Sequence, residues 1–363
     1  MKKASPSRRP GRILNLRDYR AERQDRSRLS HYLTPAVRAD WYAPQATMGR
    51  GRGAVPRFSD GTIRVFMEIK LAFGRSFSGV VGLVEDHFRV RRIALDVPDE
   101  STLCRRAQAL GTAAVTALPG VKNGLFFHLP APAGTPRPWG LVHDSTGFTI
   151  RGVGLWRGLR PHGRETGDRR EWLKVHVALD PRTGRVWAVA LTPCATHDNP
   201  VAVAMMALLQ GAGHRLQTIA ADGAYDSHSF YQAAVDIGCT RVLVPPRSDA
   251  TPWVTEGPKA TPGAGLRNDH WALTVAGERS GEDDRRAVWK RTSGYGGRNL
   301  IESFMSRMAV RTGSRCRGRT RAGRQAEVVT LMRLLNREAE RCQPLRYYRE
   351  WAHIWGTPVT RAA

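Results

Sequence analysis

The stretch "WLKVHVALDPRTGRVWAVALT", residues 172–192, decides the fold of this chain. In its first half every second residue is a large aliphatic one (Leu173, Val175, Val177 and Leu179), which is the pattern of a β-strand. "PRTG" at 181–184 is a hairpin turn signal, and "RVWAVALT" returns as a second strand. The stretch therefore predicts an antiparallel hairpin.

The segments around this hairpin extend it into a mixed sheet. Before it, "LVHDSTG" (141–147) predicts a short strand that ends in Asp144. After it, helical and strand patterns alternate through "NPVAVAMMALLQGAG" (199–213), "LQTIAAD" (216–222), "SHSFYQAAVDIG" (227–238) and "TRVLVPP" (240–246). The order strand-strand-strand-helix-strand-helix-strand indicates a mixed α/β sheet whose first three strands are antiparallel, flanked by helices.

An all-α domain is expected ahead of the sheet, at 29–128. Three short helices are predicted, from "SDGTIRVFMEIKLAFG" (59–74), "RSFSGVVGLVEDHF" (75–88) and "VPDESTLCRRAQAL" (97–110), with Ser59 or Asp60 as the first N-cap. They fit a helix-turn-helix-like DNA-binding module and also a plain three-helix bundle.

Composition shifts mark the other boundaries. "LPAPAGTPRPWG" (129–140) is rich in Pro and Gly and predicts a linker into the α/β domain, 141–340. Residues 247–290 form a polar, irregular insertion, and helical patterns return in "GRNLIESFMSRMAV" (297–310) and "AEVVTLMRLLNREAERC" (326–342). Residues 341–363 remain as a C-terminal tail.

The charge balance predicts a polyanionic partner, most commonly nucleic acid. Lys and Arg number 57 against 32 Asp and Glu, a net charge of +25, while 41% hydrophobic residues and ten Trp argue against a disordered basic chain. Residues 1–28 hold ten Lys or Arg and read as a flexible arm along DNA or a solvated tail. A second basic run lacks acids and resembles a phosphate-contacting loop; its arginines are Arg307, Arg311, Arg315, Arg317, Arg319, Arg321 and Arg324.

Five cysteines without a CxxC pair indicate reduced thiols rather than a disulfide framework. No N-terminal hydrophobic segment of a signal peptide is present, and the longest apolar run, "VAVAMMALL" at 201–209, is too short to span a bilayer. These features predict a soluble, cytoplasmic, nucleoid-associated protein.

Two acids stand where neighbouring strands are expected to end. If the strands ending at Asp144 and Asp222 are parallel neighbours, both side chains emerge at the carboxyl edge of the sheet, where ligands bind in open α/β folds. Carboxylates close together repel unless a cation lies between them, and Mg²⁺ prefers oxygen ligands. Both residues also have a purely structural interpretation, Asp144 as a loop-capping residue and Asp222 as the residue of an Asx turn.

Asp226, in the same segment as Asp222, is interpreted as structural. Together with Ser227 it lies where the next helix needs an N-cap.

A third acid follows in "TSGYGGRNLIES". Arg298 and Glu302 are four residues apart and share one face of a helix that begins by Gly297, with Tyr295 three residues earlier. Glu302 can complete a metal site, and Arg298 can hold a phosphate. The alternative is a simple i,i+4 ion pair.

These motifs resemble the D-D-E transposases of bacterial insertion sequences, which have a ribonuclease-H-like catalytic domain. The matching segments, across about 141–336, are "DSTGFTIRG", "LKVHVALDPRTGRVWAVALT", "ADGAYDS", "VLVPPR" and "WKRTSGYGGRNLIES". One branch of that family carries a signature of four residues. Its Tyr is followed by Arg after two intervening residues, by Glu after three more and by Lys after six more. Tyr295, Arg298 and Glu302 match this signature, whereas Ala309 stands at the Lys position, near Arg307 and Arg311.

The resemblance implies that Asp144, Asp222 and Glu302 hold two Mg²⁺ ions, for which Mn²⁺ substitutes, and that these acids are the catalytic residues. It also implies hydrolysis of DNA at the element ends and transfer of the 3′-hydroxyl ends into target DNA. The partners would be the terminal inverted repeats and the target duplex, bound by a dimer or larger assembly. Two alternatives stay open: a ribonuclease-H-like nuclease or resolvase without strand transfer, and a non-catalytic DNA-binding regulator.

Overall fold

The computed structural model describes residues 20–21, 24–44, 56–113, 115–132, 134–135, 137–150, 172–258, 260, 262–279 and 286–341. Most of the predicted basic arm and the predicted tail after residue 341 lie outside these residues. Within these ranges no helix is both long enough and apolar enough to cross a membrane.

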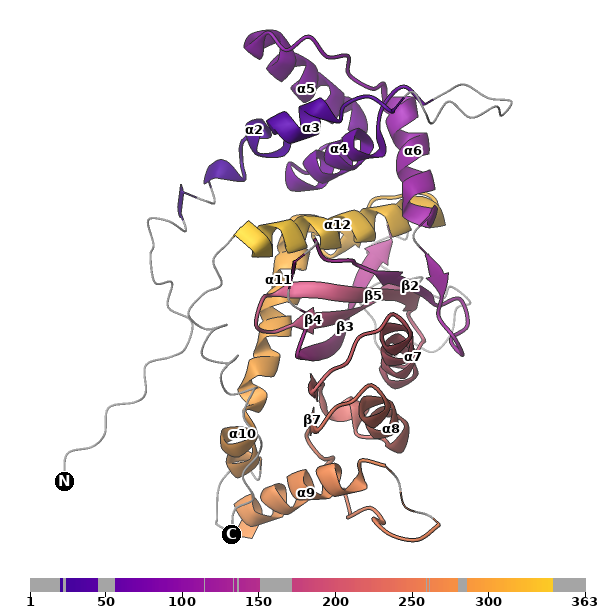
Figure 1. Ribbon diagram of the computed structural model, residues 1–363, viewed down its shortest axis with the longest axis vertical. Helices are drawn as coiled ribbons and strands as arrows, with labels where there is room; N and C mark the ends of the chain where they lie inside the picture. The colour runs from indigo at the N-terminus through magenta and orange to yellow at the C-terminus, as the bar shows by residue number, and fades with distance from the viewer. Residues whose placement is uncertain are drawn as a thin grey trace, which may run out of the picture.

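A single mixed sheet forms the centre of the molecule (Figure 1). Its strand order is β1-β2-β5-β4-β3-β6-β7, and β8 pairs with β3. β3 is antiparallel to β4 and β4 to β5, whereas β6 lies parallel to both β3 and β7. The antiparallel start and the parallel pairing of β3 with β6 confirm the predicted topology. The strands are β1 (Thr116–Ala117), β2 (Leu125–His128), β3 (Gly140–Ile150), β4 (Trp172–Asp180), β5 (Arg185–Pro193), β6 (Thr218–Ala220), β7 (Arg241–Leu243) and β8 (Arg315–Cys316).

Helices cover both faces of this sheet. α7 (Asp198–Gly211) and α8 (His228–Asp236) lie on one side, where Ile219 and Ala178 join their hydrophobic cluster. α11 (Asn299–Thr312) and α12 (Arg321–Arg341) lie on the other side (Figure 1). Both faces are apolar because side chains alternate along each strand, so each strand contributes to two cores.

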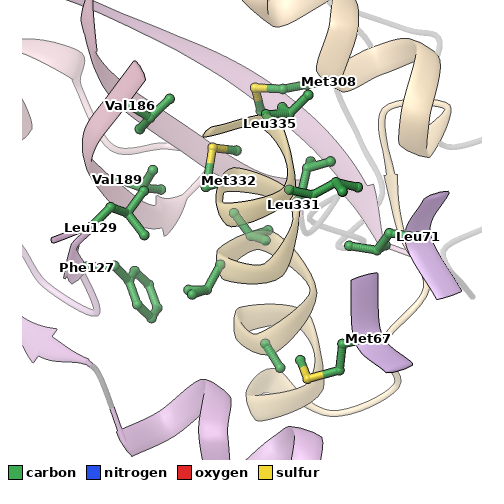
Figure 2. Close-up of a cluster of buried hydrophobic side chains, with 14 of the residues drawn as sticks. Met67, Leu71, Phe127, Leu129, Val186, Val189, Met308, Leu331, Met332 and Leu335 are labelled. Atoms are coloured by element: carbon green, nitrogen blue, oxygen red, sulfur yellow. The ribbon is translucent and has the colours of Figure 1, made fainter. Parts of the chain in front are cut away.

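α12 joins the sheet to the N-terminal helices. Figure 2 shows Leu331, Met332 and Leu335 of α12 packed with Val186 and Val189 of β5 and with Phe127 and Leu129, while Met67 and Leu71 approach from α4 (Asp60–Ala72). Helix α6 (Glu100–Ala113) crosses α12 closely, because a Cβ on Gly111 would lie 2.5 Å from the Cβ of Ala326. One continuous core therefore runs from the helices to the sheet.

Local capping explains where the N-terminal helices begin. The Ser59 hydroxyl accepts the N–H of Thr62 at the start of α4, and Ser76 accepts that of Gly79 at the start of α5 (Phe77–Arg91). Asp99 accepts the N–H of Thr102 ahead of α6. Each is a side-chain cap of a free backbone donor. Two shorter helices, α2 (Leu29–Tyr32) and α3 (Pro35–Ala39), precede them.

The sheet extends further along the chain than its sequence pattern indicates. β2 pairs with β5, although both β1 and β2 precede the Pro/Gly stretch at 129–140 that predicts a linker. The predicted end of the first strand at Asp144 is wrong, since β3 continues to Ile150. "STG" looks like a loop, but Thr149 still pairs with Trp172 because the neighbouring strand β4 provides a full ladder of partners.

The insertion at 247–290 contains helical structure. α9 (Ala264–Arg279) and α10 (Ala287–Ser293) lie beyond the β7 end of the sheet, and α10 leads through the 3₁₀ turn η4 (Tyr295–Arg298) into α11 (Figure 1).

Candidate active site

Asp144 and Asp222 lie at the same level of the sheet. The parallel register joins Val142 to Ala220, and each Asp lies two residues further along its own chain segment. Val142 and Ala220 both belong to the core under α11 and α12, so the alternation of side chains predicts that Asp144 also faces these helices. Asp144 is therefore positioned by register rather than by the end of its strand.

Glu302 and Arg298 come from the η4–α11 junction. η4 ends at Arg298, α11 begins at Asn299, and Glu302 lies in the first turn of α11. Ile301 and Phe304 are fully buried against the sheet, which fixes the rotation of the helix and leaves Glu302 on its exposed side. The predicted proximity of the two side chains is confirmed, because Arg298 Nη1 donates to Glu302 Oε1. The predicted helix start by Gly297 is wrong, since α11 begins at Asn299 and Arg298 lies in the 3₁₀ turn before it.

One guanidinium contacts all three acids. Arg298 Nη2 lies 2.8 Å from Asp144 Oδ2 and 3.9 Å from Asp222 Oδ2, while Nη1 binds Glu302. The other oxygen of each Asp is held locally: Asp144 Oδ1 accepts the N–H of Ser145 at 2.8 Å, and Asp222 Oδ1 accepts that of Ala224 at 2.9 Å. The local hydrogen bonds expected of a loop-capping residue and an Asx turn are therefore present. They leave the Oδ2 atoms of both Asp side chains directed towards Arg298.

Exposure increases across the three acids. The side chain of Asp144 is 17% exposed, that of Asp222 42% and that of Glu302 57%, whereas Arg298 is 14% exposed. The site therefore has a buried floor and an open rim.

Burial raises the pKa of Asp144, an effect opposed by Arg298 and the Ser145 N–H and reinforced by repulsion from Asp222 and Asp198. Burial likewise raises the pKa of Tyr295 to about 12, against the opposing effect of Arg298. The phenol of Tyr295 therefore stays neutral, and its ring packs on that of Trp289.

The donor chemistry of this site fits a divalent cation. Three carboxylates converge on one positive group, and carboxylate oxygens are the ligands that Mg²⁺ prefers. Among the described residues, no three Asp, Glu, His or Cys side chains are yet close enough to share one metal ion. Arg298 lies between them, so a metal bound here would compete with this guanidinium for the same oxygens.

The prediction that Asp226 helps to cap α8 is wrong. Ser227 alone caps the helix, accepting the N–H of Phe230, whereas Asp226 is buried and paired with Arg267 of α9. The physical reason is that a carboxylate deep in the fold needs a full cationic partner, which a helix N-terminus alone does not provide.

The predicted DNA-contacting arginines fall into two groups. Arg307 and Arg311 are half-buried on α11, where Arg307 lies over the Phe304 ring and Arg311 pairs with Glu338. The exposed group lies between α11 and the first residue of α12, where the Glu327 carboxylate accepts two backbone N–H groups and fixes the loop. Its members are Arg315, Arg317, Arg319 and Arg321.

A polar cluster beside the site went unnoticed in the sequence. Lys174 Nζ lies 2.8 Å from Asp198 Oδ1, and His176 Nδ1 lies 3.3 Å from the same oxygen. Tyr225 is buried nearby, and Asp198, Asp144 and Asp222 all raise its pKa in addition to burial. The signal was available, because Lys174 and His176 are polar residues on one face of an otherwise apolar strand.

The fold and this edge together define a ribonuclease-H-like protein with an acidic triad on a mixed sheet. Two family models described as transposase DDE domains match the chain, one over residues 135–337 and one over 24–153. The first covers more than half of the chain, and the chain therefore belongs to the DDE transposase family. Assignment to the branch with the Tyr-Arg-Glu signature stays a prediction.

Proposed function

We propose that this transposase cleaves DNA at the ends of an insertion sequence and joins the freed 3′-hydroxyl ends to target DNA. The observation that carries the proposal is the single guanidinium that contacts carboxylates from three separate elements, β3, the β6 end and α11. Such convergence is unexpected for structural acids, each of which would have its own partner.

Asp144, Asp222 and Glu302 are the proposed catalytic residues and would hold two Mg²⁺ ions, with Mn²⁺ as a substitute. Bound there, the ions would activate water and stabilise the leaving 3′ oxygen. The protein contributes the placement of its acids. The N–H groups of Ser145 and Ala224 orient two carboxylates, and α11 carries the third on the exposed side.

Arg298 is the proposed phosphate ligand of the site. Its Nε is buried and has no hydrogen-bond partner within the described chain, so a phosphate oxygen would satisfy this donor. Moving the guanidinium from the acids to DNA would also free the carboxylate oxygens for cations. Tyr295, half-buried one turn earlier, would hold this segment beside the DNA backbone.

The exposed arginines would provide contacts with the DNA backbone away from the site. Arg315, Arg317, Arg319 and Arg321 present fixed positive charge, as phosphate contacts require, and Arg307 and Arg311 would contribute from α11. The proposed partners are the terminal repeats and the target duplex, bound by a dimer or larger assembly in the cytoplasm, at the nucleoid.

The test is cleavage of labelled duplex carrying the sequences that flank the gene, with Mg²⁺ or Mn²⁺, by wild type and Asp222→Asn. We expect metal-dependent cleavage at the element boundary and joining of the 3′ ends to added target. The variant should lose at least about 1,000-fold in rate, because it loses one anionic metal ligand worth several kcal/mol in the transition state.

A mobility-shift assay on the same duplex separates the alternatives. Equal DNA binding by both proteins assigns the lost rate to chemistry. Cleavage without joined products would instead indicate a nuclease, and binding without cleavage by wild type under both metals would indicate a non-catalytic binder.

A further inference from the structure

The insertion is attached to the segment that follows Asp222. Arg267 of α9 donates to both oxygens of Asp226, from Nε at 3.2 Å and Nη2 at 3.1 Å. Both side chains are almost fully buried, at 3% and 2% exposed, and Arg267 also lies over the Trp253 ring at 4.6 Å. This pair fixes α9 beside the loop that carries Asp222.

α9 is in turn fixed to α10. Trp289 Nε1 donates to Nδ1 of His270, and both residues are buried. The far end of α10 is held by the sheet, since Arg241 of β7 donates from Nη2 to the Ser293 carbonyl at 2.8 Å. α10 therefore has a defined position relative to the sheet.

Trp289 then contacts the segment that carries Arg298. Its ring lies 4.6 Å from that of Tyr295, at an interplanar angle of 45°. The intervening sequence, "GYGGR" at 294–298, contains three glycines, and Gly294 has a positive φ of 73°. Glycine allows many backbone conformations, so this segment needs support from outside to hold one.

We propose that the inserted helices position Arg298 in the active site and that Trp289 is the positioning residue through which they act. The contacts form a continuous path from Asp226 through Arg267, His270 and Trp289 to Tyr295. The path links the two sides of the acidic site, the loop after Asp222 and the η4 turn. This inference rests on the proposed function, since Arg298 matters only if the site handles DNA.

The experiment measures single-turnover cleavage at saturating DNA for Trp289→Ala and for Trp271→Ala. Trp271 is the matched control, because it lies on α9 and donates its Nε1 to the Ala250 carbonyl rather than towards Tyr295. We expect Trp289→Ala to slow cleavage about 10- to 100-fold with unchanged DNA affinity, as misplacement of a catalytic group does. Trp271→Ala should slow it less than about twofold. Trp289→Phe keeps an aromatic ring against Tyr295 but loses the donor to His270, so it should slow cleavage less than Trp289→Ala and about as much as His270→Leu.

A double-mutant cycle with Arg298→Lys distinguishes positioning from general destabilisation. If Trp289 acts through Arg298, its removal should have less than about a threefold effect in the Arg298→Lys background. His270→Leu provides a second variant if Trp289→Ala fails to fold, since it breaks the α9–α10 bond and leaves the indole in place.

Two results would overturn this inference and leave the proposed function intact. The first is that Trp289→Ala slows cleavage equally in the wild-type and Arg298→Lys backgrounds, and the second is that Trp289→Ala and Trp271→Ala slow it equally. Wild-type protein that does not cleave would count against the proposed function and, with it, this inference.

Discussion

Asp222 and Asp226 lie four residues apart in the same short segment, yet their environments differ in kind. Asp226 is 2% exposed and has its own cation, Arg267. Asp222 is 42% exposed and shares one arginine, at 3.9 Å, with two other acids. The first is a balanced ion pair, and the second belongs to a cluster with excess negative charge in a strongly basic protein.

The difference gives a physical criterion for separating a proposed metal ligand from a structural acid. A buried carboxylate with a dedicated partner is fixed in place, and removing either member leaves an uncompensated charge. Three carboxylates that share one partner retain affinity for further cations and tolerate the loss of one member. The three predictions that follow test this contrast, from the largest expected effect to the smallest.

Replacing Asp226 should destabilise the fold strongly. We expect Asp226→Asn to lower the free energy of unfolding by about 3–5 kcal/mol, because Arg267 is left buried without a counter-charge. Urea denaturation followed by circular dichroism measures this quantity. Asp222→Asn is the control and should leave the stability unchanged or slightly raised, since it relieves repulsion. Equal losses in both variants would contradict the contrast drawn here.

Replacing Arg298 should strengthen metal binding in the absence of DNA. The guanidinium occupies the oxygens of Asp144 and Glu302, so Arg298→Ala should bind Mn²⁺ about tenfold more tightly, a gain of about 1.4 kcal/mol. Titration calorimetry measures the affinity directly, without a cleavage assay. Arg319→Ala, an exposed arginine away from the acids, should leave it unchanged. Weaker metal binding by Arg298→Ala would show that the arginine does not compete with the ion.

Acidification should lower the stability of the fold through His270, which is buried close enough to Asp226 to be affected by its charge. Burial lowers the pKa of His270 to about 4, reinforced by Arg241 and opposed by Asp226. The unfolded chain, with an ordinary histidine pKa near 6.5, therefore binds more protons than the folded one between pH 6.5 and 4, and stability falls as the pH falls through that window.

The expected loss from pH 7 to 5.5 is on the order of 1 kcal/mol for this group. Thermal unfolding at the two pH values measures it. His143 and His176 contribute in the same direction, because their pKa values are also lowered to about 4. His270→Gln should reduce the pH dependence without removing it, and an unchanged pH dependence would show that His270 does not titrate as proposed.

The elements that depend on local pattern were predictable. Alternation of aliphatic residues over 172–180 predicted β4, and the pair Ser59 or Asp60 predicted the start of α4, which Ser59 caps. The contact between Arg298 and Glu302 was also predictable, since residues four apart lie close together at the start of a helix. Interactions within one turn or one strand pair are encoded in adjacent residues.

Predictions that depended on distant partners were wrong or incomplete. Asp144 did not end its strand, because β4 continues to pair with β3 as far as Thr149. Asp226 did not cap a helix, because Arg267 reaches it from 41 residues away. The packing of α12 against both the N-terminal helices and β5 has no signature in the sequence.

The sequence by itself determined the mixed sheet, the excess of positive charge and the three acids Asp144, Asp222 and Glu302. Only the tertiary structure decided which cation each acid would meet. Arg298 is shared and Arg267 is not, because packing brings α9 to the loop after Asp222 and leaves the carboxyl edge open. Charge is a property of residues, but its compensation depends on distances that exist only in the folded chain.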